Sequence, residues 1–342
     1  MHSALRHLIS EKGGLGAKPP AGRGPDNNKL SFHHIPVMPD EVITALNIKP
    51  NGVYVDGTAG GGGHSVEIVR RLPHGRLVCI DKDPQAVAAA SERLREYPQA
   101  RVAQGDFADL PDILDHMEIG GVDGVLLDLG ISSHQVDVAG RGFSYHQDGP
   151  LDMRMSPEGK SAAQLLMELP EGELAGIFRK YGEERFAGRI AKKIVSERAK
   201  KHIETTLELV EIIRGSIPAA ARREGGHPAK RVFQALRIAV NGELESLRIC
   251  LDAAFERLNP GGRFAVISFH SLEDRMVKQA FAQYAKGCGC PPDFPVCVCA
   301  KKPRGRLIGK KPQTASGEEL EQNSRSAGAK LRAIEKLQAR EV

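Results

Sequence analysis

Tryptophan and long apolar runs are missing from this sequence. None of the 342 residues is tryptophan and only 5% are aromatic, so few rings are available for stacking. No segment approaches the ~18 consecutive apolar residues of a membrane-spanning helix, and the N-terminal region lacks the apolar core of a secretory signal. With 41% hydrophobic and 27% charged residues, the chain can nevertheless bury a core. We expect a cytoplasmic globular protein that makes no membrane contact.

Cysteine is too scarce, at six residues, to form a disulfide framework for a chain of this length. Cys79 lies in an expected strand and Cys250 in an expected helix, where thiols usually pack as small hydrophobic groups. The others cluster in a C-x-C-x6-C-x-C pattern: Cys288, Cys290, Cys297 and Cys299. Four thiolates can hold zinc tetrahedrally, but the C-x-C spacing is tighter than the commoner C-x-x-C. The sequence therefore leaves a structural zinc open, and no metal ligand is assigned.

Basic charge is concentrated at the two ends of the chain. The net charge is +5, with +3 in residues 1–31 and +6 in residues 301–342, which leaves −4 between them. Basic ends suit a polyanionic partner, because each cation near a phosphate releases counterions. Solvated ends without structure are the alternative. We interpret residues 1–31, which are rich in glycine and proline, as a flexible leader, and residues 301–342 as a basic C-terminal tail.

Short apolar strands alternate with helical segments along much of the chain. The strand-like runs are 53–55, 77–80, 101–103, 125–127 and 264–269. This alternation is typical of a parallel sheet covered by helices on both faces. Such sheets bind ligands beyond the carboxyl ends of their strands. Polar side chains stand at these ends: Asp56, Asp81, Asp106, Asp128 and Ser268. The sequence therefore predicts an α/β fold with a ligand site at this edge of the sheet.

The alternation stops after the fourth strand, where the pattern becomes helical. Phe186, Ile190 and Ile194, for example, recur at the spacing of one helix face. We expect a helical domain inserted into an α/β domain that continues on both sides of it. The expected boundaries are 134–240 for the insertion, and 32–133 with 241–300 for the discontinuous α/β domain.

A glycine-rich loop, DGTAGGGGHS at 56–65, lies between the first strand and the following helix. Glycine permits positive φ and a close approach of the backbone to a ligand. Asp81, 21 residues after Gly60, ends the next strand, where a carboxylate can accept both hydroxyls of a ribose. Together the loop and the acid predict an adenosine-containing cofactor on a Rossmann-like sheet.

The chemistry of the loop distinguishes between two such cofactors. A dinucleotide-binding loop has a third glycine where this sequence has Ser65, and Asp56 would repel a pyrophosphate. The same carboxylate attracts a sulfonium and an ammonium, so the charge favours S-adenosylmethionine over NAD. Phe107 offers a ring to adenine, and Asp128 lies with Gln135 where the methyl end should meet its acceptor. A glycine turn without a ligand and an NAD-dependent oxidoreductase remain as alternatives.

Several long motifs resemble the RsmH/MraW family of S-adenosylmethionine-dependent methyltransferases, which act on the cytosine amino nitrogen of small-subunit ribosomal RNA. The motifs include DGTAGGGGHS, IDKDPQA at 80–86, LLDLGISSHQVD at 126–137, RGFSYHQDGPLDMRM at 141–155, HPAKRVFQALRIAVNGEL at 227–244 and VISFHSLEDRMVK at 266–278. The resemblance runs from about residue 33 to residue 336. Near the C-terminus, Ser324 and Gly328 depart from the family pattern.

The resemblance implies a Rossmann-like methyltransferase domain with an inserted RNA-recognition domain, acting on the N4 amine of a cytosine in 16S ribosomal RNA. The substrate would be small-subunit RNA or the 30S particle, and whether the chain forms a homodimer is left open. The positions implied to contact the cofactor are Gly62, Gly63, His64, Asp81, Phe107, Asp128 and Gln135.

Methylation of an exocyclic amine depends on positioning, because the nitrogen lone pair is delocalised into the ring. Acceptors close to the amine would localise that lone pair. Our candidates for this catalytic role are Asp128, Ser132 and Ser133, although the two serines can also simply shape a turn. In other N-methyltransferases a D/S/N-P-P-aromatic tetrapeptide stands at this strand end, whereas this chain has Asp128-Leu-Gly-Ile131.

A base within folded RNA must swing out to reach the methyl group, and the inserted helical domain is the expected clamp. Basic residues on its helices are candidates for phosphate contact, with a solvated face as the alternative. His270, at another strand end, either contacts the substrate or forms structural hydrogen bonds. The candidate substrate-binding residues are Arg185, Arg189, Lys193, Arg231 and His270. An RNA-binding assembly factor that keeps the cofactor fold without catalysis is a further alternative.

Overall fold

The computed structural model describes residues 36–223, 226–287 and 302–338. Within these ranges seven strands form one sheet in the order β3-β2-β1-β4-β5-β7-β6. Their bounds are β1 Val53–Asp56, β2 Arg76–Asp81, β3 Ala100–Gln104, β4 Val122–Asp128, β5 Leu258–Ser268, β6 Gly305–Gln313 and β7 Lys330–Lys336. The strands β1 to β5 are parallel to one another, and β7 is antiparallel to both β5 and β6.

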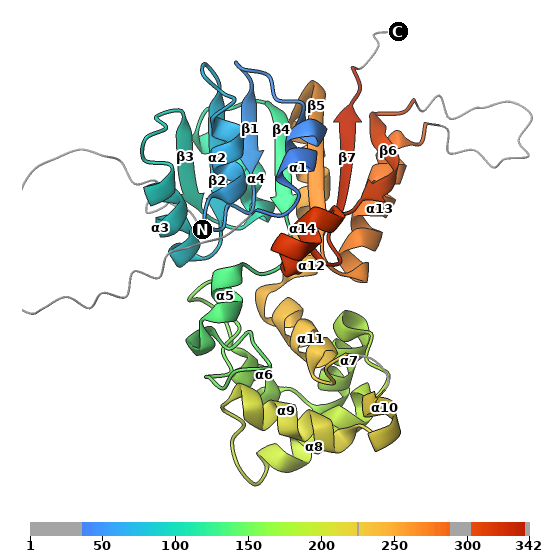
Figure 1. Ribbon diagram of the computed structural model, residues 1–342. Helices are drawn as coiled ribbons and strands as arrows, with labels where there is room; N and C mark the ends of the chain where they lie inside the picture. The colour runs from blue at the N-terminus through green and yellow to red at the C-terminus, as the bar shows by residue number, and fades with distance from the viewer. Residues whose placement is uncertain (1–35, 224–225, 288–301, 339–342) are drawn as a thin grey trace, which may run out of the picture.

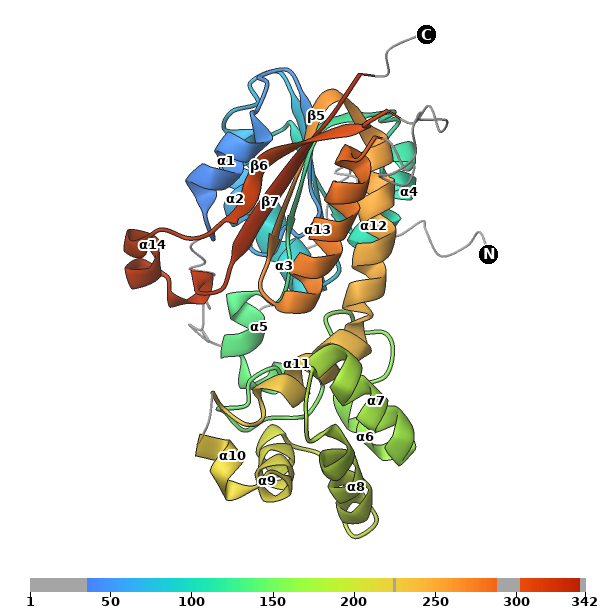
Figure 2. The same cartoon turned by 90° about the vertical axis from the view of Figure 1, so that its right-hand side faces the viewer.

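Helices cover both faces of the sheet (Figure 2). One face packs against α1 (Pro39–Leu46), α2 (Gly63–Val69) and α3 (Pro84–Arg93), and the other against α4 (Leu110–His116), α12 (Glu243–Arg257) and α13 (Ser271–Ala285). Successive strand residues alternate between the two cores, because neighbouring side chains point to opposite faces. Both cores are apolar, and this explains why the strands have continuous apolar sequences.

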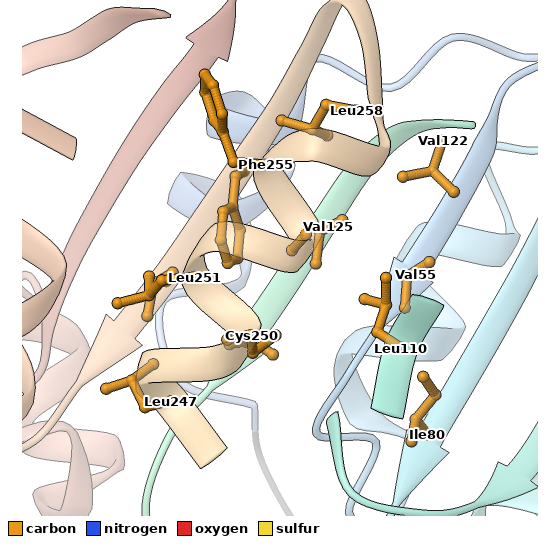
Figure 3. Close-up of a cluster of buried hydrophobic side chains, with 14 of the residues drawn as sticks. Val55, Ile80, Leu110, Val122, Val125, Leu247, Cys250, Leu251, Phe255 and Leu258 are labelled. Carbon is orange, nitrogen blue, oxygen red and sulfur yellow. The ribbon is translucent and has the colours of Figure 1, made fainter. Parts of the chain in front are cut away.

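The core on the α12 face illustrates this packing (Figure 3). Val55 and Val125 from adjacent strands belong to the same buried cluster as Leu251 and Phe255 of α12. Phe255 is fully buried and its ring stacks on that of Tyr284, with the centroids 4.1 Å apart. Burial of a large apolar side chain contributes roughly 1.5–3 kcal/mol, so this cluster holds the strand ends in fixed positions.

A helical insertion with its own core lies between β4 and β5. Its helices, which we call the insertion, are α6 (Ala162–Glu168), α7 (Glu171–Gly182), α8 (Ala187–Arg198), α9 (Thr206–Ser216), α10 (Ala219–Arg223) and α11 (Lys230–Asn241). Ile190 and Ile194 are fully buried in that core, as their spacing predicts, and Phe186 packs at its margin. Figures 1 and 2 show the insertion beyond one edge of the sheet, with α5 (Ser133–Asp137) between the two. The predicted α/β fold with a helical insertion is confirmed.

Residues 302–338 do not form the basic tail that the sequence predicts for residues 301–342. The described part of this segment supplies β6, α14 (Gly317–Gln322) and β7, so two strands of the sheet come from it. The strand β7 buries Leu331, Ala333 and Ile334. Charged residues are interspersed with these buried positions. The net charge of the segment therefore does not reveal that it forms a strand.

Other expectations fall outside the described ranges or concern the membrane. The leader at 1–31 and the cysteine cluster, Cys288, Cys290, Cys297 and Cys299, both lie outside the described residues. Among the helices that the structure describes, none is long and apolar enough to cross a membrane.

Candidate functional site

A cavity of about 510 Å³ lies where the carboxyl ends of the parallel strands face the insertion. Its volume falls within the roughly 300–1,000 Å³ range that is usual for cofactor sites. The sheet side is lined by the glycine loop and by residues at the strand ends: Gly57–Gly61, Gly63, His64, Asp81, Phe107, Asp128 and Ser132. The cavity therefore lies at the edge of the sheet where the sequence predicts a ligand site.

Asp56 stabilises the glycine loop through hydrogen bonds but does not line the cavity. Its side chain is 1% exposed, and its carboxylate accepts hydrogen bonds from the Thr58 backbone N–H at 3.2 Å and from the Ser65 hydroxyl at 2.6 Å. Burial raises the pKa of Asp56. The sequence predicted that Asp56 would face a cationic ligand, and the structure corrects this: the acids that line the cavity are Asp81, Asp106, Asp128, Glu243 and Glu273.

Asp81 fixes the shape of the loop from the end of β2. One carboxylate oxygen accepts the Gly60 N–H at 2.7 Å and the other accepts the Asp83 N–H at 2.8 Å. A carboxylate has about four lone-pair sites, so both oxygens can still accept the hydroxyls of a ribose. Burial raises the pKa of Asp81 to about 6, which makes its charge sensitive to pH in the physiological range.

His64 and Asp128 form a second polar pair in the cavity wall. His64 Nε2 lies 3.5 Å from Asp128 Oδ2, and their side chains are 6% and 15% exposed. Burial lowers the pKa of His64, but Asp128, Asp56 and Glu319 together outweigh it and raise the pKa above its ordinary value. His64 Nε2 and Asp128 Oδ1 have no hydrogen-bond partner although both atoms are buried. Buried polar atoms are almost always paired, so these two atoms are suited to bind a polar group in the cavity.

Asp106 and Phe107 follow β3 at the adjacent wall. Asp106 accepts hydrogen bonds from Lys82 Nζ at 2.9 Å and from the Ser246 hydroxyl at 2.7 Å, so its carboxylate is already engaged by protein donors. Phe107 lines the cavity as the first residue of a short 3-10 helix. The ring is thus available to pack on a flat apolar group such as adenine.

Gln135 and Ser132 form the N-terminal cap of α5. Ser132 Oγ accepts the Gln135 N–H at 3.2 Å, and Gln135 Oε1 accepts the Ser132 N–H at 3.0 Å. The Gln135 amide also donates to Asp83 at 2.9 Å. Both residues line the cavity while holding α5 in place, and the Ser132 hydroxyl keeps its own proton for donation. The Ser133 side chain lies outside the part of the chain that the structure describes.

Two predicted site residues serve the fold in ways that the sequence did not reveal. Gly62 has φ of 78° as the N-cap of α2 and packs closely on Ala90 of α3, and it is not among the residues lining the cavity. His270 caps α13: its Nδ1 accepts the Glu273 N–H at 3.4 Å, and its Nε2 lies 3.0 Å from Glu273 Oε1. The cap bond at Nδ1 favours the structural role that the sequence left open for His270, while its buried Nε2 has the Glu273 carboxylate nearby but no hydrogen-bond partner.

The predicted basic residues lie on the insertion, away from the large cavity. Arg185 and Arg231 line a second, smaller cavity, whereas Arg189 and Lys193 are exposed on α8. Lys193 pairs with Glu197 one turn later at 2.7 Å. The structure therefore brings the candidate cofactor residues together but spreads the candidate RNA contacts over the surface of the insertion.

The sequence reading missed much of the far wall of the cavity. The residues concerned come from the segment after α5, from α11 and from the connection between β6 and β7: Tyr145, Met155, Asn241, Ser324 and Arg325. Tyr145 lies within the motif RGFSYHQDGPLDMRM and could have been identified there as a rare aromatic residue. No local pattern identifies Arg325, because the pairing of β7 with β5 is what carries it to the site.

The sheet order, the loop held by a strand-end acid and the cavity at the carboxyl edge define the class: a Rossmann-like S-adenosylmethionine-dependent methyltransferase fold. The comparisons with known proteins are more specific. The model of the MraW methylase family matches residues 31–337. The chain therefore belongs to this family, and the resemblance seen in the motifs is confirmed.

Two curated relatives are similar over nearly their whole length. The chain is 55% identical over 312 residues to the ribosomal RNA small subunit methyltransferase H of Heliobacterium modesticaldum, which covers 90% of this chain and 100% of that protein. It is 54% identical over 315 residues to the protein of the same name from Symbiobacterium thermophilum, with 91% and 99% covered.

Proposed function

We propose that this protein transfers a methyl group from S-adenosylmethionine to the exocyclic N4 amine of a cytosine in small-subunit (16S) ribosomal RNA. The observation that carries the proposal is the cavity wall in which His64 Nε2 and Asp128 Oδ1 are buried without hydrogen-bond partners. Membership of the MraW methylase family and the printed names of the relatives support the same activity.

The residues at the carboxyl edge fit this cofactor. Asp81 would accept the ribose hydroxyls on its free lone pairs, and the Phe107 ring would pack on adenine. Gly63 and His64, at the start of α2, would face the methionyl end, where a ring N–H of the imidazole would complement a carboxylate. When bound, the cofactor supplies an electrophilic methyl group on a cationic sulfur, which the carboxylates at this edge stabilise.

The protein then has to orient a weak nucleophile. Asp128 Oδ1 would accept an N–H of the cytosine amine, which directs the nitrogen lone pair toward the methyl carbon. The Asp128 backbone N–H donates to Thr58 Oγ1 at 2.6 Å, so the carboxylate is held at a fixed place on the loop. Once methylated, the amine nitrogen would be cationic, and Asp128 or water would accept a proton from it. Ser132 and the start of α5 at Ser133 would close this side of the cavity.

We further propose that the insertion, together with the flanking segments of residues 134–240, recognises the RNA. Arg185, Arg189, Lys193 and Arg231 would contact phosphates, because they are exposed cations on the surface of the insertion. Their contribution should therefore fall steeply as salt is added.

The test is methyl transfer from labelled S-adenosylmethionine to small-subunit RNA, and to 30S particles, from a strain that lacks this enzyme. We expect labelled N4-methylcytidine in a nucleoside digest by mass spectrometry. Asp128→Asn should reduce the rate at least a hundredfold, since removing one stabilising group at a reacting atom typically costs ~10²–10³. The matched control is Asp115→Ala, on α4, whose exposed carboxylate pairs with Arg257. Cofactor binding without labelling of either substrate would contradict the proposal and favour an assembly factor.

A further inference from the structure

A second cavity, of about 210 Å³, lies in the insertion next to the one described above. It is too small for the cofactor, since sites for such ligands usually exceed roughly 300 Å³. Its walls combine rings and cations: Phe186, His227, Arg185, Lys230 and Arg231. Lys230 lines both cavities, so they are contiguous at this residue.

A stacked pair of rings separates the two cavities. Tyr145 lines the larger cavity, and its ring stacks on that of His227, with the centroids 4.6 Å apart and the planes 19° apart. His227 lines the smaller cavity. Phe233 meets the Tyr145 ring edge-on at 5.7 Å and supports it from within the insertion core. Each cavity therefore has one ring of this pair in its wall, and a flat base is the natural partner for either ring.

The charge of the second cavity suits a phosphodiester. Arg185, Lys230 and Arg231 contribute three cations, and Glu184 is the one acid among the described lining residues. The Glu184 side chain is buried and accepts the Phe186 N–H at 2.8 Å. Arg231 is oriented by donating to the Glu183 carbonyl at 3.0 Å.

His227 contributes a ring and not a charge to this cavity. Burial, followed by the nearby His146 and Arg214, lowers the pKa of His227. The imidazole is therefore neutral at neutral pH, which is the form that stacks without a cost in desolvated charge. The cations come from the neighbouring side chains instead.

We propose that the second cavity binds the nucleotide adjoining the target cytosine, with its base against His227 and the linking phosphate at Lys230 and Arg231. This inference rests on the proposed function, because it takes single-stranded RNA as the substrate. It assigns Tyr145 and His227 as positioning residues, one for each base. Recognition of a neighbour would explain how a base is drawn out of the RNA: the energy of stacking outside the helix compensates for the stacking that is lost.

The experiment compares binding of the trinucleotide UpCpU with binding of cytidine 5′-monophosphate, by calorimetry on the full chain saturated with S-adenosylhomocysteine. We expect the trinucleotide to bind at least about tenfold more tightly, because stacking on a protein ring contributes roughly 1–3 kcal/mol per base. Replacement of one flanking base by an abasic site should remove most of this gain. His227→Ala should do the same, with a much smaller loss of affinity for cytidine 5′-monophosphate, because Tyr145 loses only its stacking partner.

Further variants distinguish the contribution of stacking to trinucleotide affinity from the contribution of charge and from effects on folding. His227→Phe keeps a ring and should retain the affinity for the trinucleotide, whereas Arg231→Ala should weaken trinucleotide binding and reduce its salt dependence. Arg248→Ala, an exposed cation on α12 paired with Glu245, is the matched control and should change nothing. A circular dichroism spectrum and an unchanged affinity for the cofactor product establish that each variant is folded.

Two results would overturn the inference: equal affinity of the wild type for the trinucleotide and for the mononucleotide, or a folded His227→Ala that binds the trinucleotide as tightly as the wild type. Either result leaves methylation of ribosomal RNA by the wild type intact. Failure of the proposed function is distinguishable, because the wild type would then methylate neither RNA nor particles.

Discussion

Replacement of Asp81 by alanine tests how the cofactor is held. The carboxylate accepts two backbone N–H groups, from Gly60 and Asp83, and has lone pairs left for two ribose hydroxyls. Hydrogen bonds to a charged group contribute about 1.5–3 kcal/mol. We therefore expect Asp81→Ala to weaken binding of S-adenosylmethionine by one to two orders of magnitude, and loss of the support for Gly60 acts in the same direction.

The pH dependence makes this prediction specific to Asp81. Its pKa of about 6 lies above the ordinary value of 3.8 because the group is buried. The ribose donors require the ionised carboxylate, so affinity should be constant above pH 7 and fall toward tenfold per pH unit below about pH 6. At pH 5 only about a tenth of the groups would be ionised in the unliganded protein.

The raised pKa of Asp81 affects the stability of the unliganded fold in the opposite direction to ligand affinity: stability decreases as the pH rises. Between pH 3.8 and 6 the folded state holds a proton on Asp81 that the unfolded state has lost. The free energy of unfolding contributed by this group therefore decreases as pH rises through that window, by at most about 3 kcal/mol. Ionised Asp81 thus destabilises the unliganded fold at neutral pH, and the hydroxyls of a bound ribose would offset this effect.

Calorimetry with S-adenosylmethionine and with S-adenosylhomocysteine from pH 5 to 8 provides the measurement. The wild type should lose affinity below about pH 6 for both ligands, and the weak affinity of Asp81→Ala should lack this component. Asp115→Ala serves as the control at a remote exposed acid. An unchanged affinity in Asp81→Ala, or the same pH profile in variant and wild type, would refute the assignment of Asp81 to the ribose.

Two further changes test the insertion and its attachment. Asp83→Ala removes the N-cap of α3 and leaves the Arg141 guanidinium, bonded to Asp83 at 2.7 Å, without its buried partner. We expect a loss of about 3–5 kcal/mol in the free energy of unfolding, measured by urea denaturation, and a loss below 1 kcal/mol would count against this assignment. Arg189→Glu combined with Lys193→Glu should reduce binding of small-subunit RNA while leaving cofactor affinity intact. Equal RNA affinity in a filter-binding assay at physiological salt would remove that face of α8 from the interface.

The sequence predicted the position of a site residue correctly where a single strand or helix determines that position. The strand ends predicted Asp81 and Asp128 at a common edge, because parallel strands that are covered on both faces leave no other place for polar side chains. It did not reveal in which direction each side chain points. Asp56 also ends a strand, yet its carboxylate accepts a hydrogen bond from Ser65 and does not face the cavity. Spacing along the chain cannot distinguish these two orientations, since a hydrogen-bond partner supplied by the next helix decides between them.

The sequence could not predict, for a different reason, the residues that reach the cavity through the pairing of strands far apart in the chain. Arg325 lies at the cavity because β7 pairs antiparallel with β5, and it bonds to Asp137 of α5 at 2.5 Å. The net charge of the segment argued for a solvated tail, but burial of Leu331 and its neighbours overrides that preference. The composition of a segment indicates how well water solvates it. It does not show whether some of its side chains can be buried in the core, and their burial determines the register of a strand.

One short segment connects the cofactor side of the cavity to the insertion. Asp81 holds the glycine loop, and Lys82 donates to the Asn241 carbonyl at the end of α11 at 3.1 Å. Asp83 accepts from Arg141, which precedes the insertion, at 2.7 Å. Three consecutive residues, the last of β2 and the two that follow it, thus bind the loop, the last helix of the insertion and the segment that precedes the insertion. A ligand that stabilises ionised Asp81 therefore acts on a segment that also positions the insertion. For this reason cofactor binding and the placement of the target base are expected to be thermodynamically coupled, in both directions.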